Sequence, residues 1–425
     1  MTRLVLCLVG VAALTLSGCS SGSGGDTGGP VELRFSWWGN EQRAQATQKA
    51  IDAFEAANPG IAVKGEYADF NAYFDRIATQ VAADDAPDVI TMGGVYPREY
   101  GGRGALLDLA EVGGVLDLGG LDGPAVANGR FDGVQYGVPT GVNTYGIVVN
   151  PAIFEAADVP LPDDDKWTWE DFERIAGELA DRAPEGAVGV EDPTAPETLE
   201  IFSKQRGEGL YTPDGEVGIS TGSVEEWFRM TTRLRDAGST PQATVTIEQA
   251  ALSAPEQTLM GRGLAGMRFD WSNRLTALRT ASAQPLVMLR APGETAGGQV
   301  GMWLQASQLY TVNAATKHPE AAAKLISFLV DDPAAGAAIG TDRGIPANRE
   351  IRAGLAGSLN EHQEVEVAFI EEVSGKVTDE LVQGPVGSTD TSQILQRVNS
   401  DVLFDRIGPP DAARRFVDEV AAAIG

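Results

Sequence analysis

The sequence predicts an α/β protein, and three observations lead to that class. Strand-like and helix-like segments alternate from residue 31 to residue 92, as in right-handed βαβ units that build a parallel sheet. Hydrophobic residues make up 43% and charged residues 22% of the chain, which are ordinary globular values. The length of 425 residues is enough for roughly two to three domains with cores of their own.

The first five elements follow from hydrophobic periodicity. Alternating apolar and polar residues indicate a strand at 31–37, and apolar residues three and four apart indicate a helix over 41–57. A second strand is expected at 61–67 and an amphipathic helix over 70–81. Residues 87–92 complete the series as a third, short strand.

Two later helices are marked by capping boxes, in which a hydroxyl residue is followed three positions on by an acidic one. Thr168 with Asp171 predicts one helix start, and Ser223 with Glu226 predicts another.

The remaining elements leave no room for a flexible linker. A strand is expected at 145–150, a helix after Pro319 and a C-terminal helix after Pro409. Nothing after Pro30 has the composition of a linker, so any domains must be joined by crossings of the chain.

Composition argues against several classes of function. Acidic residues outnumber basic ones 60 to 32, and no domain-sized segment is basic, so binding of nucleic acid is not expected. Two cysteines rule out a disulfide scaffold, and two histidines leave little material for a zinc site. The Walker A, dinucleotide-binding, EF-hand and HExxH motifs are missing. Neither a metal nor a cofactor is therefore expected.

The N-terminus has the pattern of a lipoprotein leader. A short positive start precedes an apolar run over 4–16 that is too short to span a bilayer comfortably. Small residues then precede Cys19, whose thiol would accept a diacylglyceryl group. We expect a signal peptide over 1–18, lipid attachment at Cys19, and a Gly/Ser tether over 19–30. The protein would then be anchored to the outer face of the cytoplasmic membrane, or periplasmic.

Two patterns could indicate hydrolytic enzymes, and both are weak. Ser220 lies in a G-x-S-x-G sequence, but a turn-rich segment precedes it where a hydrolase elbow needs a strand. Glu371 and Glu372 could form the carboxylate pair of a glycosidase, yet adjacent helical residues point about 100° apart. We therefore expect no enzymatic activity and keep a cell-surface glycosidase as an alternative.

Aromatic residues give a more specific indication. Trp37 and Trp38 end the first strand, where open α/β sheets bind ligands, and adjacent strand residues face opposite sides, so at least one should be buried. Tyr96, Trp271 and Trp303 also follow strand-like segments. Sugar rings have an apolar face that stacks on aromatic planes and a rim of hydroxyls that needs polar partners.

A series of collinear segments resembles the carbohydrate-binding lipoproteins of ABC importers, the solute-binding protein family that includes maltose-binding protein. Apart from the lipobox, these segments are 54–63, 73–78, 86–90, 104–109, 136–139, 168–172, 260–267, 317–322 and 343–346. Within the family, Trp37 to Asn40 and Asp342 to Pro346 look like the oligosaccharide binders of plant-cell-wall utilisation systems.

The resemblance implies a two-lobe periplasmic-binding-protein fold. Each lobe is a mostly parallel sheet flanked by helices, and the ligand lies between the lobes. Carried onto this sequence, the N-terminal lobe is 31–141 plus 306–345, and the C-terminal lobe is 142–305 plus 346–425.

The resemblance also implies a set of ligand-binding residues. Asn143 stands where maltose-binding protein has a sugar-contacting glutamate, and this departure leaves the identity of the sugar open. The expected ligand-binding residues are Trp38, Asn40, Asp69, Met92, Tyr96, Asn143, Asp270, Trp271, Asn273, Trp303 and Gln305.

The function expected from the resemblance is capture of a carbohydrate, an oligosaccharide in particular, for delivery to the permease subunits of an ABC importer. Hinge closure around the ligand would be the mechanism, and the protein would be a monomer. A non-sugar solute such as a polyamine, metal or peptide is a further alternative for the same fold.

Three arginines raise the question of an acidic sugar. Arg98, Arg268 and Arg343 lie near the expected cleft and could bind a uronate carboxylate. The favoured interpretation pairs them instead with neighbours in the sequence, which are Glu99, Asp270 and Asp342 respectively.

Overall fold

The computed structural model describes residues 30–425, apart from residues 95, 251, 253, 296–297 and 378–379. The predicted signal peptide, Cys19 and residues 20–29 of the tether lie outside the described residues. Along the described part of the chain, no helix is both long and apolar enough to cross a membrane.

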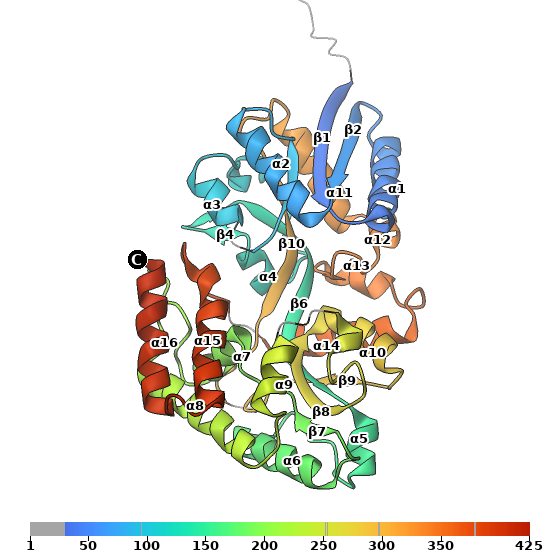
Figure 1. Ribbon diagram of the computed structural model, residues 1–425. Helices are drawn as coiled ribbons and strands as arrows, with labels where there is room; N and C mark the ends of the chain where they lie inside the picture. Colours follow the sequence, from blue (N-terminus) through green and yellow to red (C-terminus); the bar gives the residue numbers. More distant parts are fainter. Residues whose placement is uncertain (1–29, 95, 251, 253, 296–297, 378–379) are drawn as a thin grey trace, which may run out of the picture.

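All five elements predicted between residues 31 and 92 are present (Figure 1). They are β1 (Val31–Trp38), α1 (Glu41–Ala57), β2 (Ile61–Ala68), α2 (Phe70–Ala82) and β3 (Val89–Met92). β1 pairs in parallel with both β2 and β3, as the βαβ pattern predicts.

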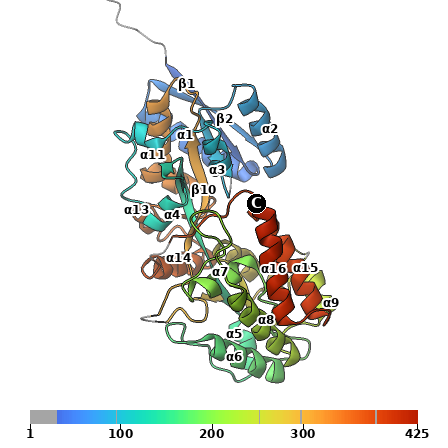
Figure 2. The ribbon, with the colours of Figure 1, turned by 90° about the vertical axis from the view of Figure 1, so that its left-hand side faces the viewer.

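Two long strands carry the chain between the lobes. β6 (Gly137–Val149) and β10 (Leu304–Val312) pair antiparallel along most of their length. The resulting sheet has the order β2-β1-β3-β10-β6-β8-β7, and both views show it running from one lobe into the other (Figures 1 and 2). β9 (Val287–Leu289) and β11 (Ile345–Pro346) also pair with β6. The lobes therefore share one continuous sheet.

The second lobe completes its sheet with a further parallel pair, β7 (Val188–Val190) and β8 (Ala265–Trp271). Its helices are α5 (Pro151–Ala156), α6 (Trp169–Arg182), α7 (Pro196–Lys204), α8 (Thr221–Asp236), α9 (Ala243–Ala250), α10 (Leu275–Ser282), α15 (Thr391–Leu403) and α16 (Pro409–Ile424). α15 and α16 lie side by side along one flank of this lobe (Figures 1 and 2).

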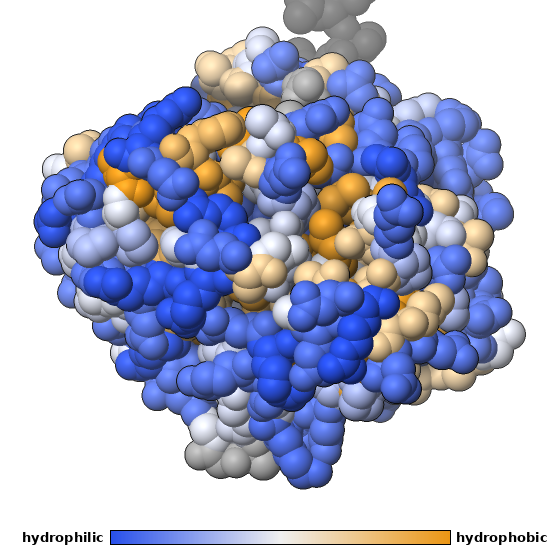
Figure 3. All heavy atoms as spheres, turned by 60° about the horizontal axis from the view of Figure 1, so that its bottom comes forward, coloured by the Kyte–Doolittle hydropathy of each residue, from blue (hydrophilic) through white to orange (hydrophobic). Residues whose placement is uncertain are grey.

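The other elements of the first lobe surround its sheet. They are α3 (Tyr96–Gly102), α4 (Gly123–Ala127), α11 (Pro319–Asp331), α12 (Pro333–Ile339), α13 (Arg349–Gly354) and the hairpin of β4 (Arg130–Phe131) and β5 (Val134–Gln135). The surface seen from below in Figure 3 is mainly hydrophilic, with apolar residues in separate patches.

The second boundary between the lobes differs from the expected one at residue 346. Ala347 is buried in the core of the first lobe, together with Leu33 and Phe35. The first-lobe carboxylate Asp122 accepts hydrogen bonds from Arg349 Nε at 2.9 Å and Arg352 Nη1 at 2.8 Å. These contacts move the boundary beyond Arg352.

One helix belongs to both lobes. On α14 (Glu361–Ser374), Val367 and Ile370 pack in the core of the first lobe. Phe369 and Val373 pack in the core of the second. Together with β6 and β10, this helix forms the connection on which any movement between the lobes depends.

One of the two predicted capping boxes is confirmed. Thr168 and Asp171 cap α6 reciprocally. The prediction for Ser223 is wrong, because α8 begins earlier and Ser223 is buried inside it. The N-cap is Ser220, whose Oγ accepts a hydrogen bond from Ser223 N at 3.2 Å.

Candidate functional site

The strand register shows which ends of the strands face the opposite lobe. Met92 at the end of β3 pairs with Leu309, nearer the second-lobe end of β10 than Val312. Trp271 at the end of β8 pairs with Tyr145, on the first-lobe side of β6. The carboxyl ends of the parallel strands in both lobes therefore face each other, and this is where α/β sheets bind ligands.

The first lobe presents an aromatic wall at this edge. Trp38 is half-buried and packs on the edge of Phe70, with ring centroids 5.7 Å apart and ring planes at 87°. Its other ring contacts on α2 are Tyr73, at 5.7 Å, and Phe74, at 5.5 Å, and Tyr96 stacks on Phe74 at 3.9 Å. Trp37 faces the other side of the sheet and is buried, as the alternation of strand residues predicts.

Two predicted ligand contacts on this wall are helix caps. Asn40 Oδ1 accepts a hydrogen bond from Arg43 N at 3.0 Å, and Asp69 Oδ1 accepts one from Ala72 N at 3.1 Å. Both residues are exposed at the edge that faces the second lobe. The caps explain why α1 and α2 begin there, and ligand contact remains a prediction for both.

Met92 is not placed to contact a ligand. Its side chain has no exposed surface and packs in a core cluster with Tyr73, Ile77 and Tyr100. All four residues of β3 are buried, because β3 lies inside the sheet and side chains of other elements pack on its faces. The Met92 side chain is therefore closed to a ligand in this structure, and ligand contact by Met92 remains a prediction.

The second lobe presents its own aromatic surface. Trp271 is half-buried and meets Tyr145 edge to face at 5.2 Å and Trp303 at 6.1 Å. Trp303 is only 2% exposed, and its Nε1–H donates to Gln305 Oε1 at 3.2 Å. Trp303 thus packs against Trp271 from within the core, and its predicted role as a ligand contact remains a prediction.

A network of ion pairs lies beside Trp271. Asp270 Oδ2 lies 2.8 Å from Arg268 Nε and 3.1 Å from Arg274 Nε, and Arg268 also pairs with Glu191. Burial alone would lower the pKa of Arg268, but the carboxylates of Glu191 and Asp270 outweigh it and raise that pKa. Both predicted site residues here, Asp270 and Arg268, are therefore engaged with protein partners.

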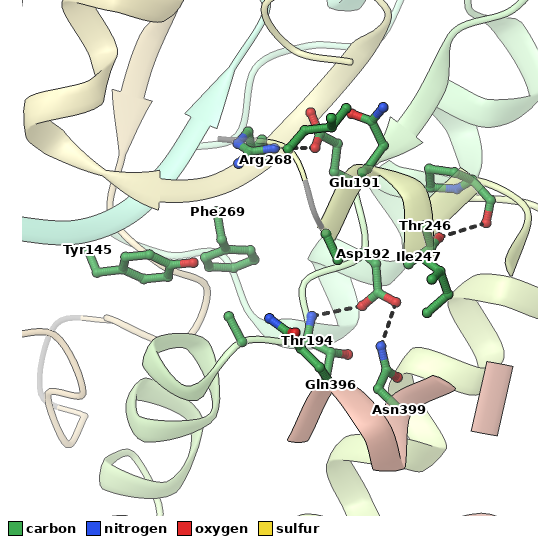
Figure 4. A pocket seen from close by; sticks show the side chains of 15 residues that line it. Tyr145, Glu191, Asp192, Thr194, Thr246, Ile247, Arg268, Phe269, Gln396 and Asn399 are labelled. Atoms are coloured by element: carbon green, nitrogen blue, oxygen red, sulfur yellow. Dashed lines mark hydrogen bonds and ion pairs between the residues drawn. The ribbon is translucent and has the colours of Figure 1, made fainter. Parts of the chain in front are cut away.

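A pocket of about 210 Å³ opens between this sheet, α9 and α15. Figure 4 shows Tyr145 and Phe269 at one side of it and Asp192 at another. Asp192 accepts hydrogen bonds from Thr194 N at 2.8 Å and Asn399 Nδ2 at 3.0 Å. The volume is below the roughly 300–1,000 Å³ typical of small-molecule sites, so the pocket fits a small group rather than a whole oligosaccharide.

Sequence analysis missed two residues of this region. Glu197, in the first turn of α7, has no ion pair with the described basic residues, and burial followed by the charge of Asp270 raises its pKa. Phe70 is one of the apolar residues of the amphipathic helix expected over 70–81, yet its side chain is 51% exposed. Both residues lie in the first turn of a helix that follows a strand. This position predicts proximity to the edge of the sheet where ligands bind, and it could have identified both residues.

The two predicted asparagine contacts, Asn143 and Asn273, differ in how far they are buried. Asn143 is 8% exposed on β6, opposite Gln305 of β10, and its Oδ1 has no hydrogen-bond partner among the described residues. Asn273 is exposed just after Trp271. This unpartnered amide oxygen is buried, so a ligand hydroxyl would reach it only after neighbouring groups move.

The three arginines considered for an acidic sugar all have protein partners. Arg98 pairs with Asp132 at 3.4 Å rather than with Glu99. Arg343 is buried and donates to Gln308 Oε1 at 2.9 Å and Thr47 Oγ1 at 2.8 Å. The predicted partner of Arg343, Asp342, pairs instead with Arg43 at 2.6 Å. Only the pairing of Arg268 with Asp270 was predicted correctly.

The residues of the enzymatic alternatives have other roles. Ser220 caps α8, and the segment before it contains only an isolated bridge between Tyr211 and Val217. Glu372 forms ion pairs with Arg290 at 3.3 Å and Lys376 at 2.9 Å. Within the described ranges, no group of three His, Cys, Asp or Glu side chains could hold a metal ion.

Comparison with known proteins agrees with this geometry. A family model of bacterial extracellular solute-binding proteins matches residues 49–365. A solved extracellular solute-binding protein family 1 structure from Alicyclobacillus acidocaldarius has a TM-score of 0.80 and 26% identity, covering 94% of this chain and 100% of that one. The two-lobe fold implied by the resemblance is confirmed.

Two curated relatives come from Streptomyces. The diacetylchitobiose binding protein DasA of Streptomyces coelicolor is 23% identical over 373 residues, which cover 84% of this chain and 85% of DasA. An uncharacterized lipoprotein in the oleD 5′ region of Streptomyces antibioticus is 28% identical over 191 residues, covering 42% of this chain and 39% of that protein. Because the family model matches more than half of its residues, this chain belongs to the bacterial extracellular solute-binding proteins.

Proposed function

We propose that this protein is the carbohydrate-binding component of an ABC importer. It captures a neutral sugar, most suitably an oligosaccharide, between its two lobes and delivers it to the permease subunits. The observation that carries the proposal is the pair of facing aromatic surfaces, Trp38 with Phe70 on one lobe and Trp271 on the other. Flat apolar rings stack on the C–H face of a pyranose.

Polar groups beside these rings suit the hydroxyl rim of a sugar. The Glu197 carboxylate forms no ion pair with the described basic residues, and the Oδ1 atom of Asn143 has no hydrogen-bond partner among the described residues. Burial raises the pKa of Tyr145, so its hydroxyl stays protonated and can donate. The relative DasA, a diacetylchitobiose binding protein, supports a sugar as the class of ligand.

The preference for a neutral sugar follows from charge. Arg98, Arg268 and Arg343 are already engaged with protein partners, and the charge of Asp270 beside Trp271 is balanced by Arg268 and Arg274. A uronate carboxylate would have to compete with these partners for a guanidinium.

The mechanism of capture is closure of the lobes about β6, β10 and α14. A ligand that contacts both aromatic surfaces binds the closed form more tightly than the open one and shifts the equilibrium toward closure. The closed form then docks on the permease, and no covalent bond changes.

The proposed location is outside the cytoplasmic membrane, with a lipid anchor at Cys19 and the tether over 19–30. The family is extracellular, and the partly matching Streptomyces antibioticus relative is a lipoprotein. The protein acts as a monomer in this proposal, since each chain carries both walls of the site.

The proposal is tested by incubating the mature chain with chito-, malto-, cello- and galacturono-oligosaccharides. A rise in Tm and calorimetric binding with one neutral series, with no product formed, is the expected result. Binding of a polyamine or peptide but of no sugar would show that the ligand class is wrong. Release of shorter sugars would instead identify a glycosidase.

A further inference from the structure

The two long strands that connect the lobes are irregularly paired at one place. β6 and β10 keep one register from Leu304 to Ala306 and return to the same register at Leu309. Between these stretches the ladder passes over one residue of each strand, Ser307 of β10 and Thr140 of β6. A strand bends most easily at such a bulge, so we expect the lobes to rotate about this place.

Ser307 is attached to the first lobe on both sides. The backbone N–H of the preceding residue donates to Asn128 Oδ1 at 3.1 Å. The Oε1 atom of the following residue, Gln308, accepts a hydrogen bond from Arg343 Nη1 at 2.9 Å. Arg343 is buried and donates through Nη2 to Thr47 of α1 at 2.8 Å. Ser307 therefore moves with the first lobe.

Asn143 of β6 is attached to the second lobe. The backbone N–H of the next residue, Thr144, donates to Ser272 Oγ at 3.2 Å, and Thr144 Oγ1 donates to the carbonyl of Trp303 at 2.8 Å. Ser272 directly follows β8, and Trp303 packs in the core of the second lobe. Asn143 and Ser307 thus lie on opposite sides of the bulges, and the distance between their side chains changes when the lobes rotate.

The side chains of Ser307 and Asn143 reach the same small space beside Gly344. A methyl group on Gly344 would lie 1.9 Å from Ser307 Oγ and 3.4 Å from Asn143 Oδ1, so the two oxygens are no farther apart than the sum of these distances. Gly344 has a φ of +90°, a backbone conformation that favours glycine. The absence of a side chain at Gly344 leaves room for the two oxygens to approach each other.

Both oxygens are buried and have no hydrogen-bond partner among the described residues. The two groups are complementary, because the Ser307 hydroxyl can donate and the Asn143 amide oxygen can accept. Among the described rings, the contacts of Trp38 stay within the first lobe and those of Trp271 within the second, so the two aromatic walls do not touch. A rotation that brings the walls together can therefore also satisfy both oxygens.

We infer that Ser307 Oγ donates a hydrogen bond to Asn143 Oδ1 when the lobes close, and that this bond stabilises the closed form. The inference rests on the proposed closure about β6, β10 and α14, and it adds a contact that the ligand itself does not make. The bond favours closure because it forms a contact and removes two unpaired buried atoms in the same step. Asn143 keeps its second lone pair and its Nδ2 group for a sugar hydroxyl.

The experiment measures Kd by isothermal titration calorimetry with chito-, malto- and cello-oligosaccharides, using the series that the unmodified chain binds. Ser307→Ala should weaken binding about fivefold, as expected for one net hydrogen bond. It should not lower the Tm of the ligand-free chain, in which this hydroxyl is unpaired. In an Asn143→Ala chain, the same change should alter Kd less than twofold, because the partner is already gone.

Ser239→Ala is the matched control, because Ser239 is also fully buried with an Oγ that has no hydrogen-bond partner among the described residues, but its hydroxyl lies beside α6. This variant should leave Kd unchanged. A second readout is the distance between spin labels on two exposed residues, Ala78→Cys on α2 and Ala421→Cys on α16, in a mature Cys19→Ser chain. With saturating sugar, Ser307→Ala should leave a larger open fraction than Ser239→Ala.

Three results would overturn the inference. An unchanged Kd for Ser307→Ala would show that the hydroxyl does not favour closure. An equal loss with and without Asn143 would mean that the hydroxyl acts through another group, and an equal loss for Ser239→Ala would make the effect a general one of buried serines. If the unmodified chain binds none of these sugars, the proposed function itself fails. The same variants are then measured with the polyamine or peptide that binds instead, which keeps the two failures distinguishable.

Discussion

Replacing Trp271 by alanine tests the placement of the site most directly. Trp271 is half-buried, with one side on Tyr145 and Trp303 and the rest of the indole exposed toward the first lobe. Loss of an aromatic stacking surface costs about 1–3 kcal/mol of binding, by analogy with bases on aromatic rings. That corresponds to a Kd raised about 5- to 150-fold.

The cost of the same substitution to folding is estimated separately. Full truncation of a buried tryptophan costs about 3–5 kcal/mol, and a half-buried one about half of that. At about 2–4 °C per kcal/mol for lobes of this size, Tm should fall by about 3–10 °C. The chain should therefore remain folded at 20 °C, where binding is measured.

Calorimetric titration at 20 °C, with circular dichroism to verify folding, measures both quantities. Trp271→Phe should recover much of the affinity because it keeps an aromatic plane. A Trp271→Ala chain that is destabilised as expected but binds with the unmodified Kd would refute the placement of the ligand beside Trp271.

Three further predictions concern anchoring, charge and pH. Cys19→Ser should move the protein from the membrane fraction to the soluble fraction without changing its Kd, and equal membrane retention would contradict lipidation. A neutral oligosaccharide should bind at least tenfold more tightly than its uronate-ended counterpart, and a uronate preference that weakens with salt would mean that Arg268 or another arginine is released for the ligand. Burial raises the pKa of Glu366 to about 7, so its protonated form favours folding and this contribution is lost as pH rises from about 4.5 to about 7. Glu366→Gln should therefore raise the free energy of unfolding at pH 8 by about 3 kcal/mol at most, seen as a higher Tm, and change it little at pH 4, whereas equal effects at both pH values would contradict this.

Local patterns predicted the elements that depend on local interactions. The strand-helix series from 31 to 92 follows from periodicity, and the capping box at Thr168 forms because both of its partners lie within four residues. The box at Ser223 failed because Ser220 offers an equally good cap one turn earlier, and only the packing of α8 decides between them.

Burial at the site depends on contacts between elements, which local patterns do not show. Met92 is buried because Tyr73 and Ile77 of α2 and Tyr100 of α3 pack around its side chain. The guanidinium of Arg343 lies over the rings of Trp37 and Tyr310 and donates a hydrogen bond to Thr47 Oγ1. None of these three residues is near Arg343 in the sequence. Conversely, Phe70 fits the apolar periodicity of its helix, but the helix begins at the rim and leaves this position exposed.

The order in which the chain supplies the strands of the shared sheet constrains how it can fold as it is made. In the first lobe, β10 fills the place between β3 and β6, and α11 adds Leu325 and Ile326 to its core. Both elements lie beyond residue 300, so a nascent chain of that length holds an incomplete first lobe with an open strand edge. Under the proposed export, the N-terminal part of the chain would lack β10 and α11 of the first lobe while the remainder is still being synthesised.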